Sequence, residues 1–216
     1  MITVSELLEN IVAPHKGVKP SFEPYHVLKT LMILREKEPL GRHVLSKQLS
    51  LGISSTRTLM KRLRVHNLIN VDPIGGCTLT SKGKSLIDSI VSVIKRIDNV
   101  SDIVEGVLKL AKYAYAALLN NYKNNMLSIG ISNARDILIS CGAKAALIIF
   151  INEHHIYIPP DDKLNEKVYP VLANIARYME ALYGDVILIS YSDKDAIAES
   201  SLYNGLVHIV LRNLLF

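Results

Sequence analysis

Cysteine is scarce in this chain of 216 residues, which holds only Cys77 and Cys141 and no CxxC pair. Two such distant cysteines build neither a disulfide framework nor a zinc knuckle. The longest apolar runs, at 145–151 and 186–189, are far shorter than the roughly 20 residues of a membrane helix. The first six residues lack the basic stretch that begins a signal peptide. We therefore expect a soluble, cytoplasmic protein with no membrane partner.

Signatures of catalysis and of cofactor binding are also missing. No phosphate loop, nucleotide-binding glycine fingerprint, Ser-His-Asp or Cys-His arrangement is recognisable in the sequence. His154 and His155 are adjacent, so on a strand they point to opposite faces. The aspartate pair at 161–162 is expected in a loop that precedes a helix. Neither pair brings the further ligands that zinc or calcium needs. We expect no catalytic residue, no metal site and no cofactor, with an uncharacterised enzyme as the least favoured alternative.

Acidic residues are depleted in the first half of the chain. Residues 1–98 hold 15 lysines and arginines against 8 aspartates and glutamates, a net charge of +7, whereas residues 99–216 hold 10 against 12, a net charge of −2. A basic half beside a slightly acidic half indicates that only the first half meets a polyanion. A basic but merely solvated surface would give the same charge.

Residues 22–97 predict a domain of three helices, a two-stranded hairpin and a further helix, preceded by an N-terminal extension at 1–21. Apolar residues recur at helical spacing from Pro24 until Pro39 ends the pattern, and Asn67 suits the left-handed position after a helix. This order of elements is typical of a winged helix-turn-helix. The expected elements are helices at 24–38, 42–49, 54–66 and 81–96, and strands at 68–71 and 77–80.

The second domain, at 98–216, follows a hinge expected at 97–100. Its helices and strands alternate, which favours a layered α/β sheet, so the whole chain is classed as α+β with two domains. The segment 112–127 fits either a buried strand or a helix. The expected elements are helices at 101–109, 133–141, 164–183 and 194–212, and strands at 113–119, 145–151, 156–158 and 186–191.

The third expected helix carries the features of a DNA-recognition helix. Thr56, Leu59 and Leu63 form one face that packs inward, and cationic and hydroxyl side chains occupy the opposite side. Cations reach phosphates or guanine edges, and a serine at the helix start can cap it while the free amides there attract a phosphate. The hairpin turn at 75–76 holds no cation, so two lysines after it supply the flanking contacts. The predicted DNA-contact residues are Ser54, Ser55, Arg57, Thr58, Lys61, Arg62, Arg64, Lys82 and Lys84.

A sequence-specific regulator that binds double-stranded DNA is the function that these features favour. One alternative is an RNA-binding or ribosome-associated module, and another is a winged helix used only for protein contacts. The apolar segment 202–216 either completes the core or forms the seam of a homodimer, which we expect as the working assembly.

A ligand site in the second domain is the weaker hypothesis. Arg135, Asp136 and Gly142 would hold a small-molecule effector at the strand ends of an open α/β sheet, with the arginine on a carboxylate or phosphate. The structural alternative, which we favour, has Asp136 at its helix N-terminus, Arg135 in a salt bridge and Gly142 as the helix stop.

Seven segments of the sequence, at 21–27, 40–42, 54–59, 79–84, 130–131, 134–136 and 141–146, match the pattern of a known family. On these segments the chain resembles a family of archaeal proteins that join an N-terminal winged helix to a C-terminal domain of unknown function 4443. The resemblance implies an archaeal source and a transcriptional regulator, and it supplies no effector or reaction. Ala145 and Ala146 depart from the family pattern, which more usually has a glycine in this segment.

Overall fold

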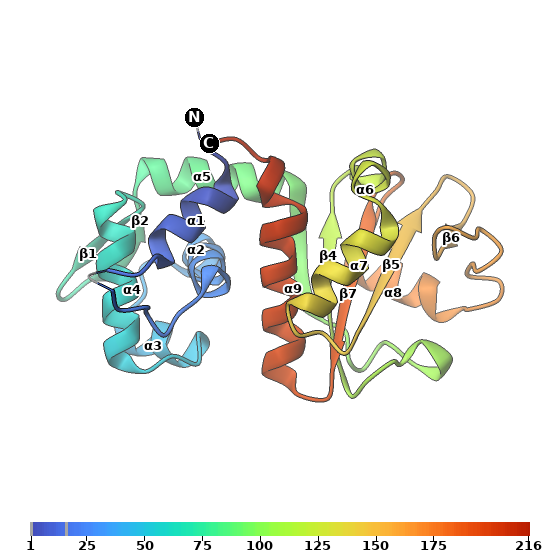
Figure 1. The fold of residues 1–216 in the computed structure, drawn as a ribbon, viewed down its shortest axis with the longest axis horizontal. Helices are drawn as coiled ribbons and strands as arrows, with labels where there is room; N and C mark the ends of the chain where they lie inside the picture. The colour runs from blue at the N-terminus through green and yellow to red at the C-terminus, as the bar shows by residue number, and fades with distance from the viewer. Residues whose placement is uncertain (1, 16) are drawn as a thin grey trace. The chain divides into compact units, whose positions relative to one another are not determined.

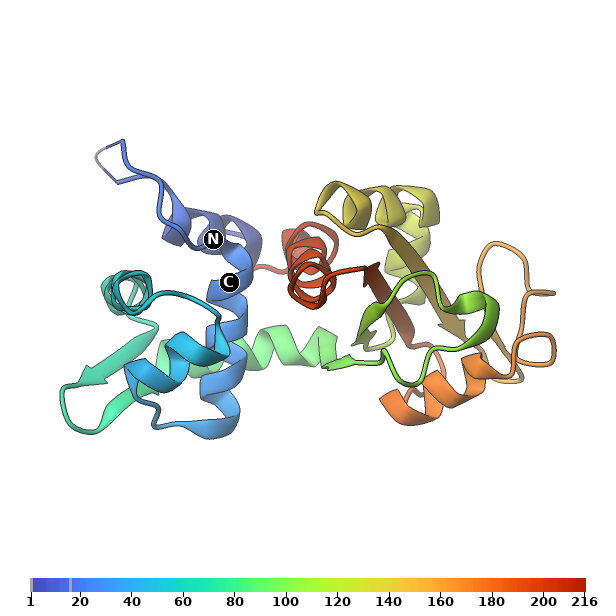
Figure 2. The same ribbon diagram turned by 90° about the horizontal axis from the view of Figure 1, so that it is seen from below.

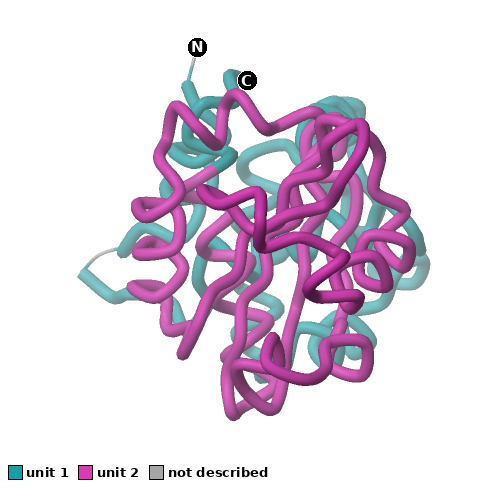
Figure 3. Tube along the Cα trace, turned by 90° about the vertical axis from the view of Figure 1, so that its right-hand side faces the viewer, with its two compact units in different colours: residues 1–90, 210–216 teal, residues 91–209 magenta. Residues whose placement is uncertain are grey.

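The computed structural model describes residues 2–15 and 17–216. Figure 1 labels most of its helices and strands, and Figure 3 shows that the chain forms two compact units. Unit 1 comprises residues 1–90 and 210–216, and unit 2 comprises residues 91–209. The sequence predicted one boundary between the two domains, near residue 97. The structure has two boundaries between its units, after residue 90 and after residue 209. None of the helices among the described residues is long and apolar enough to span a membrane.

Unit 1 contains the predicted order of three helices, a hairpin and a fourth helix, which confirms that expectation. Asn67 has a φ of 59° where α4 ends, as predicted. The helix after the hairpin, α5, ends at Val93 and not at residue 96, because the chain then joins the sheet of unit 2. The elements are α1 (Val4–Val12), α2 (Pro24–Lys37), α3 (Arg42–Gln48), α4 (Ile53–Val65), β1 (Ile69–Asp72), β2 (Gly76–Leu79) and α5 (Ser81–Val93).

The hairpin of β1 and β2 is widened by a third short extended segment. Leu40, between α2 and α3, exchanges two backbone hydrogen bonds with Cys77 on β2, at N···O distances of 3.1 and 2.8 Å. Gly76 has a φ of 89°, and a Cβ there would lie 2.7 Å from the Leu40 carbonyl oxygen. Only glycine fits this turn, because other residues meet both the positive φ and the close backbone.

Residues 1–21 include a packed helix rather than only an extension. Thr3 and Glu6 form a capping box at the start of α1, which buries an apolar face against α2. The C-terminal segment returns to this point, where Val4 N donates to Leu214 O at 2.8 Å and Phe216 N donates to Ile2 O at 3.0 Å. The two ends of the described chain therefore lie side by side in unit 1 (Figure 1).

Unit 2 is built on a five-stranded sheet in the order β3-β4-β7-β5-β6, and every neighbouring pair is antiparallel. β7 lies between β4 and β5 and pairs with both along most of its length. The α/β sheet expected from the alternation of elements is therefore not parallel. The elements are β3 (Ile94–Asn99), η1 (Gly106–Leu108), β4 (Tyr113–Leu119), α6 (Lys123–Ile129), α7 (Ile131–Ser140), β5 (Ala145–Ile151), β6 (Ile156–Tyr157), α8 (Val171–Met179), β7 (Val186–Ser192) and α9 (Asp195–Ile209), and η2 (Leu211–Asn213) follows in unit 1.

Helices cover both faces of this sheet. α8 and the segment 100–108 pack on one face with a core that includes Ile187, Ile189 and Tyr191. α7 and α9 pack on the other face, against β5 and against β4 and β7 respectively. Figure 2 shows the sheet between α7 and α8. α9 is buried along most of its length, so the apolar segment from 202 completes the core of a single chain.

Three of the expected elements of unit 2 are wrong. The helix at 101–109 is only η1, because Gly106 at its first position has a φ of 60°, which a continuous right-handed α-helix does not accommodate. The helix at 164–183 is reduced to α8, since Pro170 disfavours a helical conformation in the residue before it. The hinge at 97–100 lies largely within β3, whose backbone pairs with β4.

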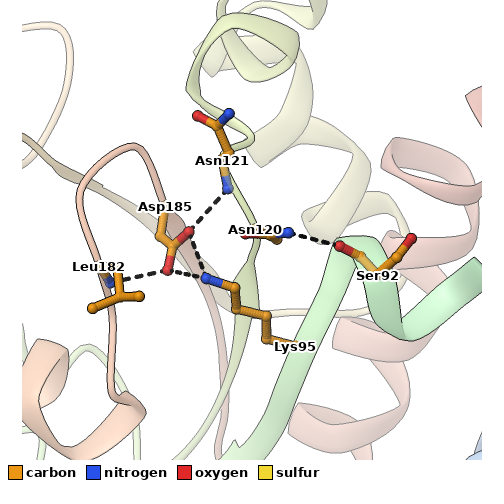
Figure 4. A network of polar contacts seen from close by, with 6 residues as sticks. All are labelled: Ser92, Lys95, Asn120, Asn121, Leu182 and Asp185. Atoms are coloured by element: carbon orange, nitrogen blue, oxygen red, sulfur yellow. Dashed lines mark hydrogen bonds and ion pairs between the residues drawn. The ribbon is translucent and has the colours of Figure 1, made fainter. Parts of the chain in front are cut away.

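A buried carboxylate joins three segments of unit 2 (Figure 4). Asp185, whose side chain is 2% exposed, accepts hydrogen bonds from the backbone N–H groups of Asn121 and Leu182, both at 2.9 Å. Lys95 on β3 places its Nζ 2.9 Å from the same carboxylate. Because two amides and an ammonium group share one acceptor, this cluster fixes the ends of β4 and β7 against β3.

We expect Asp185→Ala to lower the free energy of unfolding by about 3 kcal/mol, because it leaves two amides and a lysine without their acceptor. Asp193→Ala is the matched control, since Asp193 pairs with Lys144 at 2.7 Å in a solvent-exposed ion pair, and such pairs contribute little to stability. Urea unfolding followed by circular dichroism measures both. Equal losses of stability would contradict a special role for the buried carboxylate.

Gly83 in α5 is a second point at which the fold tolerates no side chain. A Cβ there would overlap the Leu68 carbonyl at the start of the hairpin. We expect Gly83→Ala to destabilise the protein by about 2–4 kcal/mol, because the backbone of α5 must move away. Ser85→Ala, exposed on the same helix, should change stability by less than about 0.5 kcal/mol in the same unfolding assay.

Candidate nucleic-acid interface

One face of α4 is fully buried. Thr56, Leu59 and Leu63 are all 0% exposed, which confirms the inward face predicted from their spacing. Thr56 also satisfies its hydroxyl by donating to Gly52 O at 3.1 Å. Burial on one side fixes the rotation of the helix about its axis, so the residues on the opposite side face solvent.

The solvent side of α4 carries unpaired cations. Arg57, Lys61 and Arg64 are exposed, and within the described residues no ion pair engages any of them. Ser54 and Thr58 lie beside them, and Thr58 donates to Ser54 O at 3.1 Å. The structure therefore brings these five predicted residues together on one exposed helix face.

Ser54 and Ser55 do not cap α4, so the predicted capping role is wrong. The cap position is Gly52, with no side-chain hydrogen bond, and the helix begins one residue earlier than expected. Ser55 Oγ instead lies 2.6 Å from Ser21 Oγ, in the segment before α2. The hydroxyls remain in the first turn of α4.

Arg62 is directed away from the other cations of α4. Its Nη1 donates to the carbonyl oxygens of Ile11 and Ala13, both at 2.7 Å, and its guanidinium lies 5.4 Å from the ring centroid of Phe22. These carbonyls belong to the last turn of α1 and to the residue that follows it, where backbone acceptors have no helical partner. Arg62 therefore fastens the N-terminal segment to α4.

Lys82 and Lys84 lie in the first turn of α5 and already have intramolecular partners. Lys84 Nζ is 2.9 Å from Glu38 Oε1, and Lys82 Nζ is 3.4 Å from His66 O. Glu38 also accepts a hydrogen bond from Leu79 N at 2.6 Å. This carboxylate therefore ties the end of α2 to β2 and α5.

The hairpin tip presents an apolar residue instead of a cation. Asp72 Oδ1 accepts hydrogen bonds from Ile74 N at 2.8 Å and Gly75 N at 2.5 Å, which closes the turn. The hydrogen bonds from Gly75 and Ile74 lower the pKa of Asp72 below its usual value. Ile74 is 100% exposed.

A groove runs along α4, and the sequence did not predict it. Two hollows of about 360 and 310 Å³ lie between α4 and residues 10–15 and 17–22. His66 lines the first hollow, and its pKa is lowered by burial and by the charges of Lys82 and Arg62. No sequence signal identifies His15 or His66 as groove residues, because the groove depends on where the N-terminal segment packs.

The second candidate site is a shallow hollow in unit 2. Arg135 and Asp136 are exposed on α7 and line a hollow of about 410 Å³ with Lys144. Asp136 lies in the middle of α7, so its expected place at a helix N-terminus is wrong. Gly142 follows the helix with a φ of 108° and does not line the hollow. The effector site was expected at the shared carboxyl ends of the strands of an open α/β sheet. Because this sheet is antiparallel, its strands do not share such an edge, and the expectation loses its basis.

The histidine and aspartate pairs of the sequence do not converge on a metal site. Within residues 2–15 and 17–216, no three His, Cys, Asp or Glu side chains are placed to hold a metal ion. His154 and His155 line a shallow hollow with Asp162 and Lys163.

Known proteins resemble both parts of the chain. Residues 110–209 match a family model described as a domain of unknown function, DUF4443, as the resemblance in the sequence implied. Residues 25–85 match a model described as a PH0730-like N-terminal domain. Among solved structures, "Hypothetical protein PH0730 from Pyrococcus horikoshii OT3" is 28% identical, with 89% of this chain and 94% of that chain covered and a TM-score of 0.63. No curated protein matches the chain.

We expect the stabilising effect of Glu38 to depend on pH. The hydrogen bond from Leu79 N and the Lys84 ammonium lower the pKa of Glu38 below its ordinary value of 4.5 despite partial burial. Its contribution is therefore complete above that value and decreases as the pH falls below it.

The unfolding free energies of the wild type and Glu38→Gln should accordingly differ most at neutral pH, by about 1 kcal/mol, and converge under acid conditions. Urea titrations across this pH range measure the difference. Glu36→Gln, which removes an exposed carboxylate from the same helix, is the control for the change in charge. A difference that stays constant with pH would contradict the assignment.

Proposed function

We propose, from the two matches and the geometry of α4, that unit 1 is a winged helix that binds double-stranded DNA and that the protein is a transcriptional regulator. The observation that carries this proposal is the solvent face of α4, where Arg57, Lys61 and Arg64 have no acidic partner within the described residues. A helix with one buried face and an unpaired cationic face suits the major groove, which admits an α-helix.

The arrangement around α4 supports the same proposal. Three helices, α2, α3 and α4, followed by a hairpin to which Leu40 adds one bridging residue, is the order of a winged helix. Unit 1 also holds the basic charge, with 14 lysines and arginines against 7 aspartates and glutamates, a net charge of +7 over residues 1–90 and 210–216. Attraction to phosphates supplies most of the sequence-independent affinity for DNA.

Each group on α4 has a distinct role in this proposal. Arg57, Lys61 and Arg64 neutralise phosphates or donate to guanine edges, and Ser54 and Thr58 allow the helix to approach closely. The hairpin tip carries Ile74 and no cation, so the specific contacts come from α4. Unit 2 serves as a dimerisation or effector-sensing domain, and no catalytic step is assigned to either unit.

A homodimer is part of the proposal, because paired recognition helices read half-sites about 34 Å apart. The seam between the two copies is not assigned to α9, since residues such as Leu202, Leu206 and Val207 are already buried within one chain.

Selection from a random duplex pool tests the proposal directly. We expect wild-type protein to enrich a motif, and Arg57→Ala/Arg64→Ala to abolish that enrichment because two long cations leave the groove. In binding assays at several salt concentrations, the slope of log affinity against log salt should fall by about 1 for each phosphate that the variant no longer neutralises.

Lys109→Ala/Lys163→Ala removes the same charge from exposed positions of unit 2 and should bind like the wild type. An enriched palindrome would support the dimer. A stronger affinity for RNA than for duplex DNA, or binding that disappears at physiological salt without enrichment, would contradict the proposed function.

A further inference from the structure

The segment between α1 and α2 forms an arm beside the recognition face of α4. We use the name arm for residues 13–15 and 17–20. His15 and Val18 exchange two backbone hydrogen bonds, both at 3.1 Å, so the arm turns back on itself. Figure 2 shows it as the loop that leaves the end of α1. Arg62 holds its first residue through the Ala13 carbonyl at 2.7 Å.

Two adjoining hollows form an open groove between the arm and α4. The hollow of about 360 Å³ reaches Val65 and His66 near the C-terminus of α4, and the hollow of about 310 Å³ reaches Ser54 in its first turn. His15 lines both hollows, as do Thr58 and Arg62. The two hollows together therefore follow α4 from one end to the other, and the end of α1, the arm and residues 21–22 form the second wall.

The composition of the groove suits an extended anion. His15 and Lys61 stand on opposite walls, with the hydroxyl of Thr58 on the helix between the two hollows. None of the described residues that line either hollow is an aspartate or a glutamate. A phosphate chain therefore meets Lys61, His15 and the hydroxyl of Thr58 at points along a partly apolar groove, and it meets no repulsive charge among the described lining residues.

The openness of the groove argues against an enclosed metabolite. Val18 on the arm is 71% exposed and Val65 on α4 is 76% exposed, so the rims stand in solvent. Sites for small molecules bury roughly 70–90% of the ligand surface, and a ligand here would stay largely hydrated. A nucleic-acid backbone can bind an open row of charged side chains, because it gains affinity from successive phosphate contacts.

We propose that the groove between the arm and α4 holds one sugar–phosphate strand at the edge of the major groove that α4 enters. His15 contacts this strand from the arm and Lys61 contacts it from α4, while Arg62 acts as a positioning residue that keeps the arm in place. This proposal rests on the proposed function, and it makes residues before α2 part of the DNA-contact surface.

Charge reversal on the arm provides the first test. Fluorescence anisotropy with a short duplex of random sequence measures the dissociation constant of the full-length protein at several salt concentrations. We expect His15→Glu to weaken binding about five-fold or more at low salt and to reduce the salt slope by about 1, since a carboxylate replaces a group that contacts phosphate. His15→Gln should have a smaller effect.

Val107→Glu adds the same charge at a 74% exposed position of unit 2 and should bind like the wild type. Both positions are exposed, so thermal unfolding should show little change in either variant. If His15→Glu binds like Val107→Glu while Arg57→Ala/Arg64→Ala binds more weakly, the arm proposal is overturned and the proposed function stands. If the wild type does not bind duplex DNA, both fail.

Cleavage of DNA from the arm provides a second, direct test. An iron–EDTA reagent attached to Val18→Cys, in a Cys141→Ser background, should cut the bound duplex at one confined position on the strand next to the groove. Cys77 stays unlabelled because it is 0% exposed and burial raises its thiol pKa to about 11. The same reagent on Val107→Cys should give no confined cut, and equal cutting from both sites would overturn the proposal.

Discussion

The complete burial of one side of α4 is the constraint on which the candidate interface depends. Thr56, Leu59 and Leu63 leave no exposed surface, so the helix cannot rotate without exposing leucine side chains to water. Because the cations are three and four residues apart from one another, they share the remaining face. The chemistry of this surface thus follows from the packing beneath it.

Unit 1 is closed by hydrogen bonds between residues far apart in the sequence. Arg62 reaches the carbonyl of Ile11, and Val4 donates its backbone N–H to the carbonyl of Leu214. The N-terminal helix is therefore held at both ends, at its start by the C-terminal segment and at its finish by α4. The chain enters unit 2 after residue 90 and leaves it after residue 209, so unit 1 is completed only by a segment that follows unit 2 in the sequence.

Unit 2 relies on a different device, an antiparallel sheet whose strands come from separate parts of the chain. β7 is the last strand in the sequence and lies between β4 and β5, which makes the register of the sheet depend on its fit to both neighbours. Asp185 precedes β7 and accepts hydrogen bonds from Asn121, which follows β4, and from Lys95 on β3. One carboxylate therefore joins β3 to the ends of β4 and β7. Such an antiparallel sheet does not form the ligand crevice that open parallel sheets have at the carboxyl ends of their strands.

The sequence by itself determined the local elements of unit 1 and the two faces of α4. Helical periodicity, Pro24 and Asn67 each affect only residues a few positions away in the sequence, so these signals can be read locally. It also indicated most strands of unit 2, whose apolar runs are short and bounded. Only the tertiary structure decided the antiparallel strand order, the return of the C-terminal segment to α1, the partner of Arg62 and the groove beside the arm. Each of these joins residues that are distant along the chain, and no local pattern records such a pairing, since it arises only when the segments are packed together.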